Sequence, residues 1–97
     1  MIGRLRKTDR AERDINNISD WIARDSESAA EKWLEELDEK LKVVATMPGI
    51  GTDRSDLRKG LRSYAFDNYL IFFKPTKSGV DIIRVIHGAR DYRRFFK

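Results

Sequence analysis

Apolar residues in the first half of the chain recur at the spacing of amphipathic helices. The first series, at intervals of four, three and four residues, consists of Ala11, Ile15, Ile18 and Ile22. Because residues at these intervals share one face of a helix, the series predicts a helix that ends near Arg24. Asp9 and Glu12 have the spacing of a capping box and indicate that this helix begins at Asp9.

A second apolar series follows after a short polar linker and consists of Trp33, Leu34, Leu37, Leu41, Val44 and Ala45. It predicts a helix that begins near Ser28, where Glu31 completes a capping box, and that ends before Pro48. The linker, residues 25–27, is short enough to join the two helices as an antiparallel hairpin. Each helix has one apolar stripe, so we expect the hairpin to cover another apolar surface.

The second half of the chain has the pattern of strands. After a loop at residues 48–60, the segments 61–66, 69–73 and 80–87 are rich in β-branched and aromatic residues and predict three strands. The connections at 67–68 and 75–79 are short, which favours a meander of two hairpins. The last two strands are nearly continuous apolar runs, so both of their faces are expected to be at least partly covered.

These elements predict one domain over residues 1–97, in the α+β class. A further short strand is expected at residues 2–7, so the order is strand, helix, helix, strand, strand, strand. The helical hairpin is expected to pack on one face of a small, mainly antiparallel sheet. A chain of 97 residues has room for one core and for no second domain. Residues 88–97 mix arginines with aromatic residues and are interpreted as a short terminal helix.

Charge is distributed unevenly over the two halves of the chain. Residues 1–53 hold 9 Lys/Arg against 12 Asp/Glu, a net of −3, whereas residues 54–97 hold 11 against 4, a net of +7. The C-terminal half is therefore suited to an anionic partner, either a nucleic acid, a nucleoprotein machine or an acidic protein segment.

The composition indicates a protein without metal or cofactor. Cysteine is absent and His87 is the one histidine, so disulfides, thiolate metal sites and a histidine zinc set are excluded. No apolar segment follows the basic residues near the N-terminus, and no stretch approaches the length of a membrane span. We therefore expect a cytoplasmic protein.

Several segments of the chain resemble the RelE/ParE toxin superfamily, and the stretch 69–91 is most similar to ParE. The resemblance is carried by Met47-Pro48-Gly49-Ile50-Gly51, by Leu57-Arg58-Lys59-Gly60-Leu61-Arg62, by Tyr69-Leu70-Ile71-Phe72-Phe73 and by Arg84-Val85-Ile86-His87-Gly88-Ala89-Arg90-Asp91. It covers nearly the whole chain, although its most specific part is about a quarter of it.

The resemblance implies the RelE/ParE-like fold and the role of a toxin in a type II toxin–antitoxin system. ParE-like toxins inhibit growth by poisoning DNA gyrase, contribute to plasmid stabilisation, and are neutralised in a hetero-oligomeric complex with a small ParD-like antitoxin. Their RelE relatives instead cut messenger RNA on the ribosome.

The residues favour binding over catalysis. Leu70 and Phe96 stand where RelE toxins have a catalytic arginine and a catalytic tyrosine, and Arg90 alone matches a RelE catalytic position. The paired RelE lysines fall near Leu61 and Ser63, with Arg62 between them as the one substitute. The first alternative is a ribosome-dependent mRNA endonuclease using Arg62, His87 and Arg90, and the second is a non-toxic basic module that binds nucleic acid.

The C-terminal segment and the last strand supply the candidates for target binding, which are Arg84, Arg90, Tyr92, Arg93, Arg94 and Phe95. Cations beside aromatic rings can contact phosphates or anchor a protein interface. Alternatively, Phe95 and Phe96 close the core and the arginines are only solvated. Arg84 shares a strand face with Ile82 and Ile86 by alternation, and in so apolar a strand it needs a carboxylate, with Asp91 and Asp67 as candidates, or a target contact.

The helices supply the candidates for antitoxin binding, which are Trp21, Ile22, Trp33 and Leu37. The two tryptophans are interpreted either as core residues or as parts of a groove for an amphipathic antitoxin helix. An antitoxin strand added to the sheet edge is a second mode of binding. His87 similarly has two interpretations, as a catalytic group or as a hydrogen-bonded structural residue.

Overall fold

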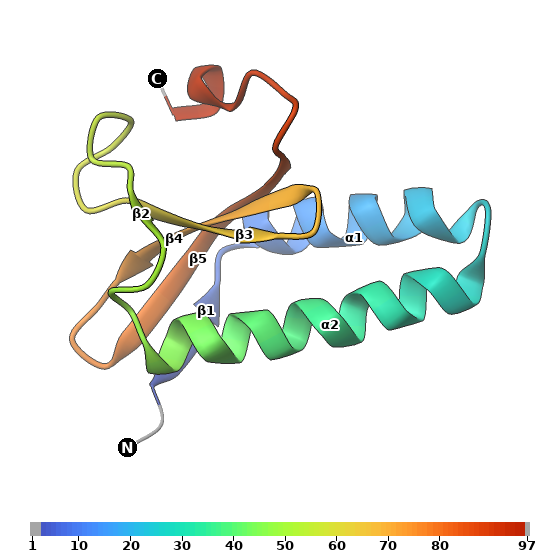
Figure 1. The fold of residues 1–97 in the computed structure, drawn as a ribbon, viewed down its shortest axis with the longest axis horizontal. Helices are drawn as coiled ribbons and strands as arrows, with labels where there is room; N and C mark the ends of the chain where they lie inside the picture. The colour runs from blue at the N-terminus through green and yellow to red at the C-terminus, as the bar shows by residue number, and fades with distance from the viewer. Residues whose placement is uncertain (1–2, 97) are drawn as a thin grey trace.

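A computed structural model describes residues 3–96 and shows two helices packed on one five-stranded sheet (Figure 1). The elements in chain order are β1 (Arg4–Lys7), α1 (Asp9–Ala23), α2 (Glu27–Thr46), β2 (Thr52–Asp53), β3 (Arg62–Phe66), β4 (Tyr69–Pro75), β5 (Gly79–His87) and a 3₁₀ helix, η1 (Tyr92–Phe96). The α+β class, the helical hairpin and the three-strand meander are confirmed. Within the predicted strand 2–7, residue 2 lies outside the described residues, as does residue 97 of the tail.

The sheet has the strand order β1-β5-β4-β3-β2, with β5 between β1 and β4. β5 runs parallel to β1 and antiparallel to β4, and the remaining pairs are antiparallel. The two-residue strand β2 corrects the prediction of an unbroken loop at 48–60, because Thr52 pairs with Ser63 and Asp53 with Arg62. The sheet is thus mainly antiparallel, as expected, with one parallel pair at the N-terminal edge.

Both helices begin at caps other than the predicted ones. The Thr8 hydroxyl accepts a hydrogen bond from the Ala11 amide at 3.1 Å, and the Ser26 hydroxyl accepts one from the Ala29 amide at 3.1 Å. Each cap lies one or two residues before the predicted start, because an extended Ser or Thr can reach the amide three residues ahead. Asp9 and Glu12 instead lie in the first turn of α1, where their charges suit the helix dipole.

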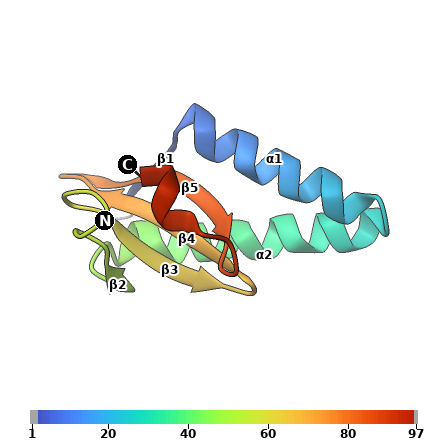
Figure 2. The same ribbon diagram turned by 90° about the horizontal axis from the view of Figure 1, so that it is seen from above.

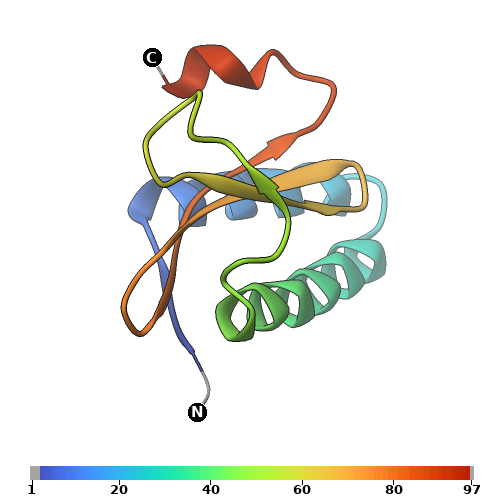
Figure 3. The ribbon, with the colours of Figure 1, turned by 60° about the vertical axis from the view of Figure 1, so that its left-hand side comes forward.

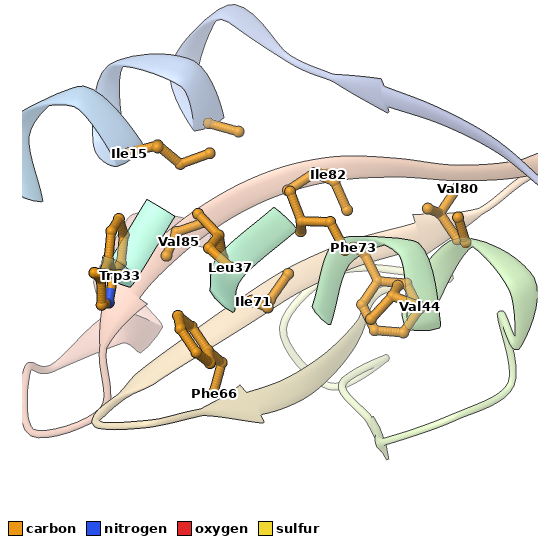
Figure 4. Close-up of a cluster of buried hydrophobic side chains, with 13 residues drawn as sticks. Ile15, Trp33, Leu37, Val44, Phe66, Ile71, Phe73, Val80, Ile82 and Val85 are labelled. Atoms are coloured by element: carbon orange, nitrogen blue, oxygen red, sulfur yellow. The ribbon is translucent and has the colours of Figure 1, made fainter. Parts of the chain in front are cut away.

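The hairpin of α1 and α2 covers one face of the sheet and forms the larger hydrophobic core (Figure 4). This helix-face core consists of Ala11, Ile15, Trp33, Leu37, Leu41, Val44, Ala45, Phe66, Ile71, Phe73, Val80, Ile82 and Val85. It joins apolar stripes predicted from both helices to residues of the last three strands. Trp33 packs edge-on against Tyr69, with ring centroids 5.5 Å apart, and is 6% exposed.

The opposite face of the sheet is covered by η1 and by the loop between β2 and β3 (Figures 2 and 3). Four buried residues form this second core, Leu61, Phe72, Ile86 and Phe96. The terminal helix predicted for residues 88–97 is therefore present as a 3₁₀ helix. Coverage on both faces explains why β4 and β5 read as nearly continuous apolar runs.

A β-bulge changes the alternation predicted for β5. Phe72 lies opposite Arg84, but its neighbour Phe73 lies opposite Ile82, so one residue of β5 is inserted. Ile82 and Val85 consequently both belong to the helix-face core, whereas Ile86 belongs to the second core. The expectation that Ile82 and Ile86 share a face was wrong for this reason.

Within residues 3–96, no helix is both long and apolar enough to cross a membrane.

Candidate functional site

Arg84 is neutralised by a carboxylate that sequence reasoning did not identify. Its Nε donates to Asp14 Oδ2 at 2.7 Å and its second terminal nitrogen donates to Oδ1 at 3.0 Å. Both side chains are largely buried, with exposures of 11% and 8%. The predicted partners Asp91 and Asp67 were wrong, because α1 lies along the edge of β5 and brings Asp14 within reach. One signal was present in the sequence, since Asp14 falls on the apolar stripe of α1.

The N-terminal part of α1 also closes the edge of β5 beyond the end of β1. The Thr8 hydroxyl donates to the Ile83 carbonyl at 3.1 Å, and Asp14 Oδ2 accepts a hydrogen bond from the Val85 amide at 3.0 Å. Asp14 therefore satisfies a guanidinium and a strand amide at once. These edge groups already form hydrogen bonds, so they are not available to an added antitoxin strand, the second mode of antitoxin binding considered above.

The C-terminal segment is fixed to the sheet by its aromatic residues. The rings of Tyr92 and Phe96 pack on Phe72, with centroid distances of 5.4 and 4.8 Å. Arg54 donates to the Tyr92 hydroxyl at 3.3 Å, and Arg93 forms an exposed ion pair with Asp56 at 3.0 Å. Phe96 thus closes a core, as the alternative interpretation held, while the arginines of η1 remain exposed.

Guanidinium groups surround the half-buried ring of Phe95. The guanidinium carbons of Arg84, Arg90 and Arg94 lie 4.8, 4.9 and 5.3 Å from the ring centroid. Arg58, from the loop before β3, stacks in the same way on Phe96 at 5.3 Å. The structure therefore brings together most of the predicted target-binding residues, and it adds Arg58, which lies in a segment that carried the family resemblance.

A separate groove lies between α1 and the ends of β4 and β5. It has a volume of about 430 Å³ and is lined by Asn17, Ile18, Trp21, Tyr69, His87 and Arg90. Trp21 is 63% exposed there. Burial raises the pKa of the Tyr69 phenol, with a smaller contribution from Asp67, so the hydroxyl keeps its proton at neutral pH.

The four predicted antitoxin-binding residues divide into two groups. Trp21 lies in the groove, and Ile22 is half-buried against the helix-face core. Trp33 and Leu37 are 6% and 2% exposed, which makes them core residues that a partner does not reach without unfolding the hairpin. Helical spacing alone did not show that Trp21 lies in an open groove, because the groove depends on where β4 and β5 lie relative to α1.

The three residues of the endonuclease alternative do not form one site. The Arg62 side chain donates to the carbonyls of Gly49, Ile50 and Gly51, at 2.8, 3.2 and 3.1 Å, and so holds the loop after α2. Across β4, Arg62 is in line with Ile82, whereas His87 is in line with Phe66. Strand geometry thus separates the two by roughly 16 Å, whereas acid and base groups act within about 3 Å of one phosphate.

One ring nitrogen of His87 forms a hydrogen bond within the turn after β5. Its Nδ1 accepts a hydrogen bond from the Ala89 amide at 3.0 Å, while its carbonyl accepts one from the Arg90 amide at 3.1 Å. The imidazole therefore shapes the turn that leads into η1, which agrees with the structural interpretation of this residue.

Comparison with known proteins points to one family. Residues 5–92 match the family described as ParE toxin of type II toxin–antitoxin system, parDE. Toxin ParE1 of Mycobacterium tuberculosis is 32% identical over 66 residues, which are 67% of each chain. Toxin ParE1 of Caulobacter vibrioides is 29% identical over 87 residues, 87% of this chain and 88% of that one.

A solved structure shares the fold. It is described as the chromosomal ParDE TA system from P. aeruginosa, and its matching chain superimposes with a TM-score of 0.74. The match covers 89% of this chain and 96% of that chain at 19% sequence identity. The two chains thus share a fold, although most of their aligned residues differ.

Proposed function

The chain belongs to the ParE toxin family of type II toxin–antitoxin systems, and on that basis we propose that it inhibits DNA gyrase by direct binding in the cytoplasm and is neutralised by a ParD-like antitoxin. The observation that carries the proposal is the pair of exposed arginines, Arg90 and Arg94, that the C-terminal segment holds against Phe95. This arrangement supplies a fixed, cationic binding surface. Of the endonuclease alternative, Arg62 lies far along the sheet from His87 and Arg90, which line one groove.

The antitoxin is assigned to the groove beside Trp21. An amphipathic helix placed there buries the exposed indole and meets the Tyr69 hydroxyl, which remains a hydrogen-bond donor. Arg90 belongs both to this groove and to the arginines around Phe95. An antitoxin in the groove therefore also contacts Arg90 and keeps this cation from the target. This contact explains how antitoxin binding neutralises the toxin.

The target is tested with a gyrase supercoiling assay, run beside a translation-coupled mRNA cleavage assay on the same purified protein. We expect loss of supercoiling or accumulation of cleaved DNA, with messages intact. The variant Arg90→Gln/Arg94→Gln should lose most of this inhibition. The control Arg24→Gln/Lys32→Gln removes the same charge from exposed positions at the far end of the hairpin and should retain it. Cleaved messages with normal supercoiling would contradict the proposal.

The antitoxin groove is tested by measuring the affinity of the purified toxin for its antitoxin. Trp21→Ala should weaken the complex, because a large exposed aromatic residue in a groove is a typical anchor. Met47→Ala is the matched control, since Met47 is also an exposed apolar residue but lies at the end of α2. An equal effect of the two substitutions would place the antitoxin elsewhere.

A further inference from the structure

Five arginines gather where the start of α1 meets η1, and we call them the arginine cluster: Arg10, Arg58, Arg84, Arg90 and Arg94. Three of them surround Phe95, and Arg58 stacks on Phe96. Arg10, Arg58 and Arg84 line a surface depression of about 340 Å³, to which both phenylalanines also contribute. The cluster thus joins residues from four separate parts of the chain.

The cluster has far more positive than negative charge. Asp14 bonds Arg84 and lies 3.6 Å from Arg10. Among residues 3–96, no other carboxylate forms an ion pair with a member of the cluster. The five guanidinium groups therefore share one carboxylate, and Arg58, Arg90 and Arg94 have no carboxylate partner among these residues. Their mutual repulsion is relieved by an anionic ligand, so the surface is suited to bind one.

Stacking prepares these guanidinium groups for a phosphate. A guanidinium that packs on an aromatic ring keeps its N–H donors available at its edge, while the ring restricts its motion. Arg58, Arg90 and Arg94 are exposed and stacked in this way. Less side-chain entropy is lost when such a group binds, and its planar fork matches two phosphate oxygens.

The same stacking argues for a duplex as the ligand. Proteins that bind single strands present open aromatic faces on which bases stack. Here three guanidiniums lie against Phe95, and Phe96 is buried beneath Arg58. We propose that the arginine cluster binds the phosphodiester backbone of duplex DNA, independently of base sequence. This inference rests on the proposed function in one respect, since it makes the DNA held by gyrase part of the target.

The test is fluorescence anisotropy of a labelled duplex of arbitrary sequence, without gyrase, over a series of salt concentrations. The logarithm of the binding constant should fall linearly with the logarithm of the salt concentration. Arg58→Gln/Arg94→Gln should weaken binding about tenfold and reduce the slope by about two, because each phosphate contact contributes about one. The control Arg24→Gln/Lys32→Gln, with the same loss of charge, should stay within about twofold of the native protein.

Three outcomes would overturn the inference. Equal weakening by the two double variants would reduce the binding to overall charge, and absence of binding at low salt would remove it. Tighter binding to single-stranded RNA of the same length than to the duplex would make RNA the ligand in place of duplex DNA.

The two proposals can fail separately. If Arg58→Gln/Arg94→Gln loses gyrase inhibition while the native protein binds no duplex, the surface contacts the gyrase protein and only this inference fails. If the duplex binds as expected and supercoiling is unaffected, the proposed function fails and the DNA site stands.

Discussion

The two faces of the sheet are covered in different ways. The helix face is sealed by two long helices over a continuous apolar core that includes Leu37, Leu41 and Trp33. The opposite face is covered by a 3₁₀ helix and a loop over a second core of four buried residues, with arginines at its rim. One face therefore supplies most of the buried apolar area, and the other presents charge on a thin layer of aromatic rings.

This difference separates stability from recognition. Apolar burial stabilises the fold roughly in proportion to area, so the helix face dominates the free energy of unfolding. The opposite face buries enough to hold η1 in place, and its guanidiniums stack on rings that are themselves anchored. Asp14 connects the two regions, because it lies on α1 and bonds Arg84, which in turn lies against Phe95.

The largest effect is expected from breaking that connection. Asp14→Ala leaves the Arg84 guanidinium and the Val85 amide without their acceptor, and should lower the free energy of unfolding by about 3–5 kcal/mol. Urea denaturation measures the loss. The double variant Asp14→Leu/Arg84→Met should recover part of it, because no buried charge is left unpaired. A double variant less stable than Asp14→Ala would contradict this account.

A core truncation on the helix face is expected to come next. Leu41 is fully buried, so Leu41→Ala should cost about 3 kcal/mol, within the usual 2–5 kcal/mol for this change. The matched control is Leu34→Ala on the same helix, where the side chain is exposed and the cost should stay within about 0.5 kcal/mol. Similar losses at both positions would show that the helix face is not the main source of stability.

A truncation on the opposite face should cost less. Phe96→Ala removes a buried ring, but the terminal segment can detach while the rest stays folded, so we expect a global loss of about 1–2 kcal/mol. Hydrogen exchange should become faster at the amides of residues 92–96 and change little in α2. A loss as large as that of Leu41→Ala, with uniform exchange, would mean that the two faces unfold as one unit.

The smallest effect concerns an ion pair away from both cores. Arg6 donates two hydrogen bonds to Asp81 across β1 and β5, and these lower the pKa of the Asp81 carboxyl. Because the folded state favours the charged carboxylate, its contribution is fully present above the usual pKa of about 3.9 and is lost as pH falls through the lowered pKa of the folded state. Asp81→Asn should therefore lower the melting temperature slightly at pH 7, and this difference should shrink as the pH is lowered below about 3.9. A difference in melting temperature that is as large in acid as at pH 7 would show that the ion pair with Arg6 is not its cause.

Periodicity was enough to predict most of the fold. The helical spacing of Ala11 to Ile22 and the apolar runs of the last strands each reflect a face that is buried in the structure. The caps were displaced because Asp9 and Ser28 are also residue types that suit an N-cap, and spacing alone did not favour Thr8 and Ser26 over them. β2 gave no signal of its own, since its two residues pair only where Arg62 holds the preceding loop.

The candidate site was predicted in part. The arginines and aromatic residues of the C-terminal segment were recognisable from composition, and they lie together as a surface. Asp14 and Arg84 are 70 residues apart, so their pairing depends on where α1 meets β5, which no local pattern encodes. The bulge in β5 likewise reverses a face assignment that strict alternation supports.

The position of β5, between β1 and β4, has a consequence for synthesis of the protein. Arg6 and Asp81 pair although 75 residues separate them, and β5 also pairs with β4. Until residues 79–87 have been translated and have left the ribosome, the sheet therefore lacks the strand that joins β1 to β4. Such distant contacts form late, and translation products that stop before residue 79 cannot close the domain. Incomplete copies of the toxin should consequently be unfolded, open to proteases and harmless to the cell that makes them.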